Sequence, residues 1–315
     1  MKLIIAFFRL IRWPNLCFIA LTQLLFYYCI IQRIITAPID SYFNFSSFIY
    51  LVIASVLIAA AGYIINDYFD LNIDLVNKPS RLIIEKTIKR RSAILWHILF
   101  SLLGIALCFY IDFRSRTYLL GFANFICVVL LFAYSVALKK KLLIGNILIA
   151  LLTAWVIMVV YLCYKNTFYI QGAPGNIDSS MTNRFTRMSM LYAGFAFVIS
   201  LIREVVKDME DREGDAKYGC KTIPIIWGIP AAKVFVAVWI IVLTGILGIT
   251  QFYVLQFGWW WSAVYCFLLI ILPLIWILQR LYKASIPKDY HQLSIAIKLV
   301  MFTGILSMIF FKIYP

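Results

Sequence analysis

This chain of 315 residues contains nine long apolar stretches, which restrict it to the folds of integral membrane proteins. A helix needs about 20 apolar residues to cross a hydrocarbon layer of about 30 Å, in which its backbone N–H and C=O groups must pair with each other. The composition also indicates a membrane protein, since 64% of the residues are hydrophobic and only 14% are charged. The stretches cover residues 14–36, 47–69, 93–112, 116–138, 143–164, 188–206, 231–251, 257–279 and 292–311. We therefore expect an all-α polytopic membrane protein with nine transmembrane helices.

The basic residues indicate how these helices are oriented. If the N-terminus is cytoplasmic, 21 Lys and Arg residues fall on the cytoplasmic side, 7 fall on the opposite side, and Lys298 lies within the last stretch. An excess of Lys and Arg is typical of cytoplasmic loops. The net charge of +15, which in a soluble protein would suggest nucleic-acid binding, is therefore interpreted as a topology signal. The absence of a recognisable targeting segment favours a prokaryotic inner membrane.

Ten of the fourteen acidic residues gather in two short windows, which follow the second and sixth apolar stretches. Both windows carry the spacing Asp-x2-Asp-x3-Asp, in Asp67, Asp70 and Asp74 and again in Asp208, Asp211 and Asp215. If each window continues its helix, about 100° per residue places the three aspartates within roughly 60° of one another. Because like charges on one helix face repel, the arrangement predicts a bound cation. Carboxylate oxygens, with the amide oxygen of Asn66, suit Mg²⁺.

Two such metal sites suggest that a polyphosphate binds between them. Aspartates cannot bind a diphosphate directly, whereas Mg²⁺ ions that bridge carboxylate and phosphate oxygens neutralise charge and stabilise a departing diphosphate. Basic side chains near the windows could bind the same phosphates, with Arg binding in bidentate fashion. The candidates are Lys78, Arg81, Arg203 and Lys207. The alternative is that these residues serve only the topology.

At these residues the chain resembles the UbiA superfamily of intramembrane prenyltransferases. The run from Asn66 to Asp74 matches the family signature Asn-Asp-x2-Asp-x3-Asp, and the run from Arg203 to Asp215 is similar to its second Asp-rich motif. Further positions similar to the family are Arg12, Pro14, Asn15, Asn77, Pro79, Tyr134, Ser135, Gly145, Asn146, Gly219, Thr222 and Pro224. We expect one membrane domain, residues 1–315, with Asp-rich cytoplasmic loops near 66–92 and 203–230.

The resemblance implies a helix bundle around a central cavity, with its active site toward the cytoplasm. The chain has small residues that permit close approach of the helices in such a bundle. They are Ala60, Ala61, Gly62, Gly104 and Gly121.

The resemblance also implies Mg²⁺-dependent transfer of a prenyl group from an isoprenyl diphosphate to an acceptor in the membrane. The expected Mg²⁺ ligands and catalytic residues are the six aspartates, with Asn66 assisting at the metal. The expected substrate-binding residues are Asn15, Asn66, Lys78, Arg81, Tyr134, Arg203 and Lys207. Asn15 could instead cap the first helix, and Tyr134 could be an interfacial aromatic residue. His97 and His291 have no sequence partner that suggests a catalytic base, and we predict structural roles for both.

The acceptor is less constrained than the diphosphate, because the shared motifs recognise only the donor. The second motif looks most like the branch of the family that transfers a geranylgeranyl group from geranylgeranyl diphosphate to a glycerol-phosphate ether lipid. Aromatic acceptors of quinone biosynthesis, 4-hydroxybenzoate or dihydroxynaphthoate, stay open because carbon prenylation uses the same allylic cation. A cation-coupled transporter is the alternative that is not an enzyme. The position of the acids at helix ends and not at the midplane argues against it.

Overall fold

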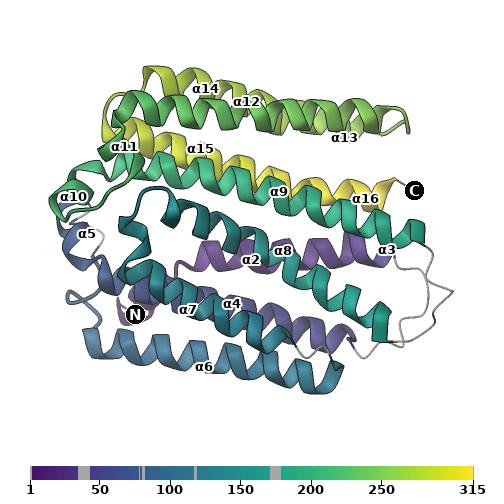
Figure 1. Cartoon of the computed structure of the whole chain (residues 1–315), viewed down its shortest axis with the longest axis horizontal. Helices are drawn as coiled ribbons and strands as arrows, with labels where there is room; N and C mark the ends of the chain where they lie inside the picture. The colour runs from purple at the N-terminus through teal and green to yellow at the C-terminus, as the bar shows by residue number, and fades with distance from the viewer. Residues whose placement is uncertain are drawn as a thin grey trace. The chain divides into compact units, whose positions relative to one another are not determined.

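The computed structural model describes residues 2–34, 43–77, 79, 82–116, 119–170 and 179–314 (Figure 1). These residues form helices, and within them the only β pairing is an isolated bridge between Ile84 and Ile88. The all-α prediction is confirmed. The chain folds as two compact units. Unit 1 comprises Met1–Leu24, Ile34–Leu138 and Trp155–Met190, and unit 2 comprises Leu25–Arg33, Lys139–Ala154 and Leu191–Pro315. The single-domain expectation therefore stays a prediction.

Eight helices in the described ranges are long and apolar enough to cross a membrane. They are Trp13–Ile34, Phe45–Phe69, Arg90–Ser115, Ile144–Lys165, Thr182–Glu210, Gly228–Leu255, Trp260–Lys283 and Pro287–Ile313. The remaining predicted span, 116–138, corresponds to α7 (Leu120–Val136), which has 17 residues. At 1.5 Å per residue α7 is about 25 Å long, which is shorter than a hydrocarbon layer of about 30 Å. Eight of the nine predicted spans are thus confirmed as helices long and apolar enough to cross a membrane, and the ninth stays a prediction.

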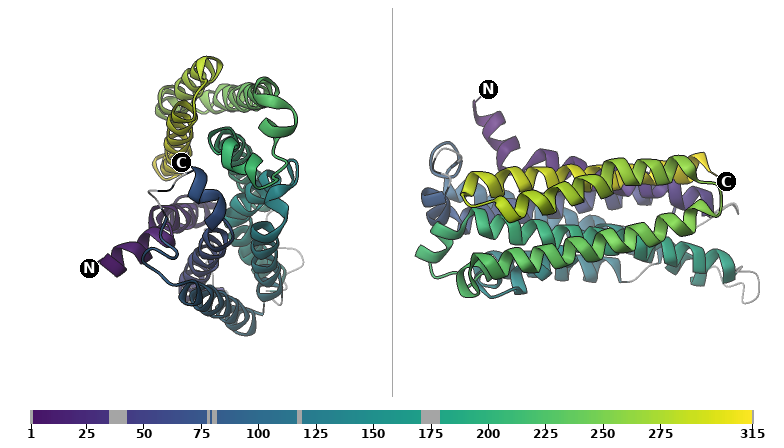
Figure 2. Two further views of the ribbon diagram at one scale, coloured as in Figure 1. Left: turned by 90° about the vertical axis from the view of Figure 1, so that its left-hand side faces the viewer. Right: turned by 90° about the horizontal axis from the view of Figure 1, so that it is seen from above.

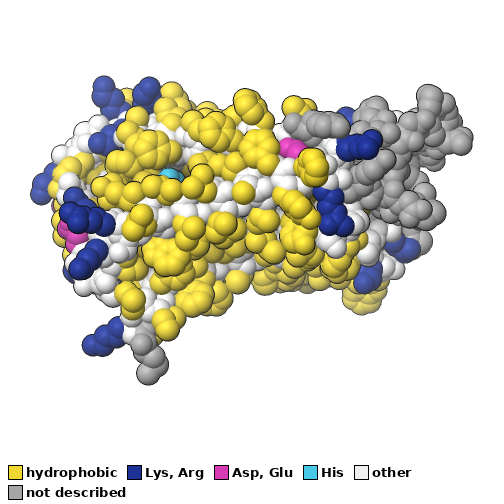
Figure 3. Space-filling view, turned by 90° about the horizontal axis from the view of Figure 1, so that it is seen from below, with side chains coloured by type: hydrophobic (Ala, Val, Ile, Leu, Met, Phe, Trp, Pro, Cys, Tyr) yellow, Lys and Arg dark blue, Asp and Glu magenta, His cyan; other side chains and the backbone are white. Residues whose placement is uncertain are grey.

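The outer surface has the composition that a lipid environment requires. Large apolar side chains are exposed on most of the long helices, including Phe113 at 88% and Ile249 at 73%. On the face shown in Figure 3, hydrophobic side chains form a broad field, and Lys and Arg gather toward its ends. Since exposed apolar area of this extent is rare on soluble monomers, the surface supports a multi-pass integral membrane protein.

Unit 1 is built around α4 (Phe45–Phe69), which packs against α6 (Arg90–Ser115) and α7 (Figures 1 and 2). Small residues allow this close approach. A Cβ added to Gly104 of α6 would lie 2.7 Å from Ile58 Cγ1 and 3.3 Å from the Ala54 carbonyl oxygen, both in α4. The His97 ring on α6 contacts the Ala61 carbonyl oxygen through Nδ1 at 3.0 Å. His97 therefore has a structural contact between helices. The other elements of unit 1 include α1 (Lys2–Leu10), α2 (Trp13–Leu25) and α5 (Leu71–Asn77).

Two of the acidic residues outside the windows cap helices. Asp112 is buried at the end of α6, where its carboxylate accepts hydrogen bonds from the backbone N–H groups of Leu120 at 3.1 Å and Gly121 at 2.6 Å. These N–H groups open α7 and have no partner within the helix. In unit 2 the Asp289 carboxylate likewise accepts from the N–H groups of Ser285 and Ile286, just before α15. These capping contacts explain both acidic residues without a metal site.

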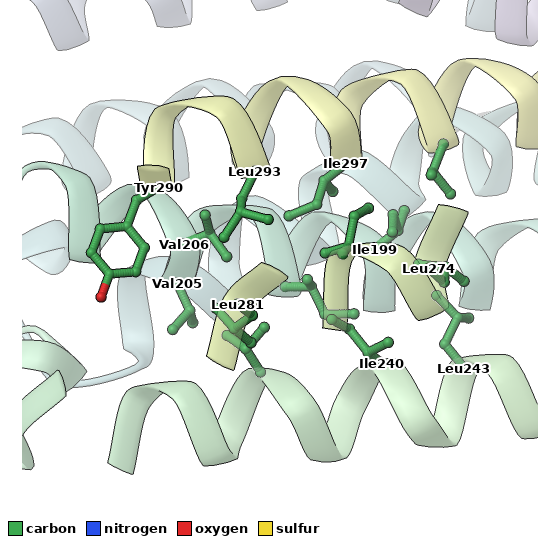
Figure 4. Close-up of a cluster of buried hydrophobic side chains, with 14 of the residues drawn as sticks. Ile199, Val205, Val206, Ile240, Leu243, Leu274, Leu281, Tyr290, Leu293 and Ile297 are labelled. Carbon is green, nitrogen blue, oxygen red and sulfur yellow. The ribbon is translucent and has the colours of Figure 1, made fainter. Parts of the chain in front are cut away.

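Unit 2 is held together by an apolar core shared by α9 (Ser179–Glu210), α12 (Gly228–Leu255), α14 (Leu272–Lys283) and α15 (Pro287–Leu306). Figure 4 shows side chains of these four helices meeting in one layer. The buried members include Ile199, Val206, Ile240, Leu274, Leu293 and Ile297. The other elements assigned wholly or partly to unit 2 are η1 (Phe26–Ile31), η3 (Leu138–Lys140), α8 (Ile144–Ile170), α10 (Arg212–Lys217), α11 (Ile223–Ile226), α13 (Trp260–Cys266), η4 (Phe267–Ile271), η5 (Ser307–Ile309) and α16 (Phe310–Ile313). This packing fixes the end of α9, where the second acidic window begins.

The contact at Gly104 predicts how two glycines will tolerate a methyl group. We expect Gly104→Ala to lower the thermal unfolding midpoint of the protein in detergent, because overpacking costs about 1–3 kcal/mol. Gly245→Ala in α12 is the matched control, since nothing lies within 4 Å of an added Cβ there. It should leave the midpoint unchanged or raise it, because Ala forms helix better than Gly by about 1 kcal/mol. Equal midpoints for the two variants would contradict the close packing of α4 and α6.

Candidate active site

Each acidic window lies where a long helix meets a short one. In unit 1, Asp70 separates α4 from α5, with φ −84° and ψ −1°. In unit 2, Asp211 separates α9 from α10, with φ −93° and ψ 7°. The middle aspartate of the repeated spacing therefore has nearly the same backbone conformation in both units.

The backbone hydrogen bonds around the two junctions also correspond. The N–H group of the middle aspartate donates to the carbonyl four residues earlier, at 2.9 Å for Asp70 and 2.8 Å for Asp211. The N–H group of the third aspartate then donates to the carbonyl of the middle one, at 2.8 Å for Asp74 and 3.1 Å for Asp215. The two windows thus share a local structure as well as a sequence pattern.

The prediction that each window continues its helix is wrong at Asp70 and Asp211. Asp is a weak helix former because its side chain competes for backbone donors. At each of these two residues the long helix ends, and a new short helix begins at the next residue. Each helix is interrupted for one residue, and the shared face of the three aspartates stays a prediction. Within the part of the chain that the structure describes, no three His, Cys, Asp or Glu side chains form a group that could hold a metal ion.

In unit 1 the first aspartate is paired with Arg12. The Arg12 Nη2 atom donates to Asp67 Oδ1 at 2.6 Å, and the guanidinium lies over the Tyr63 ring at 5.1 Å. The Asp67 carboxylate raises the pKa of Arg12, so the guanidinium stays charged. Arg12 joins α1 to α2 with φ 51°, a left-handed conformation that is uncommon for a residue other than glycine. The turn before the first membrane helix therefore supplies a cation to the acidic window.

Asn66 provides the observation that tests whether Mg²⁺ fits this window. Its Nδ2 atom donates to Asp70 Oδ2 at 2.8 Å, which leaves the amide oxygen directed elsewhere. That Oδ1 atom is buried and has no hydrogen-bond partner among the described residues. Mg²⁺ usually takes only one or two protein carboxylates and completes its shell with water and substrate phosphates. An orphaned amide oxygen beside carboxylates is a donor set that fits this ion.

In unit 2 the first aspartate of the window is held by an amide. Asn146, buried near the start of α8, donates from Nδ2 to Asp208 Oδ2 at 2.8 Å. The loop before α8 is tied to the segment after α10 as well, since the Lys221 N–H group donates to the Lys140 carbonyl oxygen at 2.8 Å. Hydrogen bonds of this kind orient a carboxylate toward a metal.

The predicted phosphate ligands of α9 surround Glu204. Lys207 Nζ donates to Glu204 Oε1 at 2.6 Å, and Arg203 Nη1 lies 3.5 Å from the same oxygen. The Arg203 Nε atom is buried and has no hydrogen-bond partner in the described ranges. Arg203 thus keeps an N–H group that could donate a hydrogen bond to a substrate oxygen.

The remaining predicted site residues and His291 are located as follows. Asn15 is the third residue of α2, so it lies inside the helix and not at its N-cap, and Tyr134 lies half-buried in the last turn of α7. Lys78 and Arg81 lie outside the described residues. His291, for which the sequence suggested no partner, contacts Glu210 Oε1 through Nδ1 at 3.0 Å. The partner is 81 residues away in the sequence, and the structural role of His291 stays a prediction.

Two residues of the candidate site, Arg12 and Asn146, were not predicted. Each contacts an aspartate that is distant in sequence, by 55 residues for Arg12 and 62 for Asn146. No local spacing could reveal such contacts. The only signal in the sequence was that both positions resemble the family.

The contact between Asn146 and Asp208 predicts a change in metal affinity. For Asn146→Ala, the Mg²⁺ concentration giving half-maximal thermal stabilisation in inorganic diphosphate should rise about tenfold or more, as for other residues that orient metal ligands. Thr153→Val is the matched control, because it removes a hydrogen bond between α8 and Ser200 of α9 without contact to Asp208. Equal Mg²⁺ requirements in wild type and Asn146→Ala would contradict this role.

Comparison with known proteins agrees with the motifs. The profile of the UbiA prenyltransferase family matches residues 24–305. A digeranylgeranylglyceryl phosphate synthase from Methanosphaera stadtmanae is 30% identical over 249 residues, which cover 78% of this chain and 81% of that protein. The apo structure of a UbiA homologue from Aeropyrum pernix K1 has a TM-score of 0.61 at 16% identity, covering 97% of this chain and 98% of that chain.

A second solved structure has the same fold with ligands bound. It is a UbiA homologue from Archaeoglobus fulgidus bound to GPP and Mg²⁺, with a TM-score of 0.55 at 16% identity, covering 96% of this chain and 99% of that chain. At these identities the structural likeness concerns the fold, whereas the family profile covers most of the sequence. The family predicted from the two motifs is thus confirmed, and the chain belongs to the UbiA prenyltransferase family.

Proposed function

We propose that this chain transfers a geranylgeranyl group from geranylgeranyl diphosphate to the free hydroxyl of a glycerol-phosphate ether lipid, in a Mg²⁺-dependent reaction. The observation that carries the choice of acceptor is the 30% identity, over 78% of this chain, to a protein named digeranylgeranylglyceryl phosphate synthase. Membership of a prenyltransferase family supports an enzyme over the transporter that the sequence left open. The excess of basic residues in the predicted cytoplasmic loops supports an active site on the cytoplasmic side of a prokaryotic inner membrane.

The two acidic windows would act on the same diphosphate. Asn66, Asp67, Asp70 and Asp74 would hold Mg²⁺ on one side, and Asp208, Asp211 and Asp215 would hold it on the other. Mg²⁺ supplies neutralisation of the phosphate oxygens, which stabilises the diphosphate as it leaves. The Mg²⁺ and GPP bound by the Archaeoglobus fulgidus homologue support a role for Mg²⁺ and a prenyl diphosphate in this family.

The protein side chains would prepare the departure of the diphosphate. Arg203 and Lys207, with Lys78 and Arg81, would donate hydrogen bonds to its oxygens. Arg12 would hold the Asp67 carboxylate, as Asn146 holds that of Asp208. Asn15 and Tyr134 would contact the substrates.

The reaction exchanges one carbon–oxygen bond for another. The bond between the allylic carbon and the diphosphate oxygen breaks, and its electron pair leaves with the diphosphate. The hydroxyl oxygen of the acceptor then gives an electron pair to the allylic carbon and forms the ether bond. Its proton passes to the released diphosphate. Exposed apolar surfaces on the helices would let both isoprenoid chains stay in lipid.

An acceptor panel tests this proposal. Purified protein would receive geranylgeranyl diphosphate and Mg²⁺ with geranylgeranylglyceryl phosphate, 4-hydroxybenzoate or dihydroxynaphthoate, and mass spectrometry would identify the products. We expect a product only from the lipid, with a second geranylgeranyl group attached, and none when EDTA removes the metal. A product from an aromatic acceptor alone would overturn the choice of acceptor. Cation-dependent flux in proteoliposomes without diphosphate release would overturn the enzyme.

A further inference from the structure

One face of the short helix α1 packs on unit 1. At about 100° per residue, Ala6, Phe7 and Leu10 fall within an arc of about 100° on this helix. Ala6 and Leu10 are buried in an apolar cluster with residues of α4, α5 and α6. The centroid of the Phe7 ring lies 5.1 Å from that of Trp96 and 6.2 Å from that of Phe100, both in α6. These contacts fix α1 beside the first half of α6.

The opposite face of α1 is apolar but exposed. Ile4, Ile5 and Phe8 share an arc centred about 160° from the docked face, and they are 61%, 51% and 48% exposed. Lys2 and Arg9 lie within about 20° of each other on the edge between the two faces, and both are exposed. An apolar face beside a basic edge is typical of a helix that lies in a membrane surface. The alternative is that a protein partner covers this face.

The contacts of α1 place it at a depth that lipid reaches. Trp96 and Phe100 lie six and ten residues beyond Arg90, where α6 begins, so they are about 9 and 15 Å along that helix. The helix is long and apolar enough to cross a membrane, and the neighbouring Leu95 and Leu99 are 67% and 45% exposed. The exposed face of α1 therefore continues an apolar surface of α6 that faces lipid.

The chain connection keeps α1 at the end of a membrane span. Only Ile11 and Arg12 separate it from Trp13, where the first span begins. Arg12 has φ 51°, and Figure 2 shows α1, at the purple end of the chain, lying across the direction of the long helices of unit 1. Two residues reach at most about 7 Å, so α1 cannot leave the membrane surface. Because Arg12 contacts Asp67, this is the end of unit 1 that carries the first acidic window.

We propose that α1 is an interfacial helix whose partner is membrane lipid. Its exposed apolar face lies against the lipid chains of the leaflet at this end of unit 1, and its basic edge lies against the phosphates of the headgroups. The distribution of Lys and Arg predicts that this is the cytoplasmic leaflet. Lipid fits better than a protein partner because the face is continuous with the lipid-facing surface of α6, and because the charges of Lys2 and Arg9 complement phosphate.

Spin-label accessibility tests the proposal on the full chain in nanodiscs of phosphatidylglycerol and phosphatidylcholine. Cys17, which is exposed, would be replaced by Ser, so that the remaining six cysteines are buried. A nitroxide would then be attached in separate variants to Ile4→Cys, Phe8→Cys or Arg9→Cys. Power saturation compares collisions with O₂, which concentrates in lipid, and with a water-soluble nickel complex. Leu102→Cys, at an exposed position of α6, is the lipid reference.

We expect the ratio of O₂ to nickel accessibility at Ile4→Cys and Phe8→Cys to be several times that at Arg9→Cys and close to that at Leu102→Cys. Nickel access at either apolar position as great as at Arg9→Cys would show that the face meets water and would overturn the proposal. Low access to both reagents at either position would show a protein surface over the face, such as a second copy of the chain, and would overturn it as well. If one apolar variant does not fold, the other decides.

Discussion

Charge at the ends of apolar helices is the constraint on which the rest of the structure depends. In a chain with 64% hydrophobic residues, an acidic side chain near hydrocarbon costs free energy. Each such side chain therefore needs a cation or a hydrogen-bond donor. Asp112 meets this need with the first N–H groups of α7, and Asp67 meets it with Arg12. Asp208 meets it with the amide of Asn146. The acids thus mark the points where the chain leaves the apolar core and where polar chemistry becomes possible.

The two junctions show how a repeated spacing becomes a repeated structure. Asp70 and Asp211 each end a long helix with ψ near zero, and each accepts a hydrogen bond from the N–H group of the aspartate four residues later. At each junction the α-helix is interrupted for one residue before a short helix begins. The same geometry in units 1 and 2 supports an origin of the two windows from a common helix-and-loop element.

Much of the fold could be predicted from the sequence because it depends on local properties. Runs of apolar residues locate eight of the membrane helices, and small residues such as Gly104 mark close helix packing. The break at Asp70 could not be predicted from helical periodicity, because the periodicity assumes the continuity that the junction interrupts. The partners of Asp67, Asp208 and Glu210 escaped prediction for a different reason. Each contact joins residues at least 55 positions apart, and only the packed helices bring them together.

The central claim is that the two acidic windows act on one diphosphate, and a double-mutant cycle tests it most directly. The affinity for inorganic diphosphate in Mg²⁺ would be measured for wild type, Asp70→Asn, Asp211→Asn and the double variant. If both windows serve the same ligand, the two losses will be non-additive by more than about 0.5 kcal/mol. Losses that add to within about 0.5 kcal/mol would show two independent sites and would contradict the account.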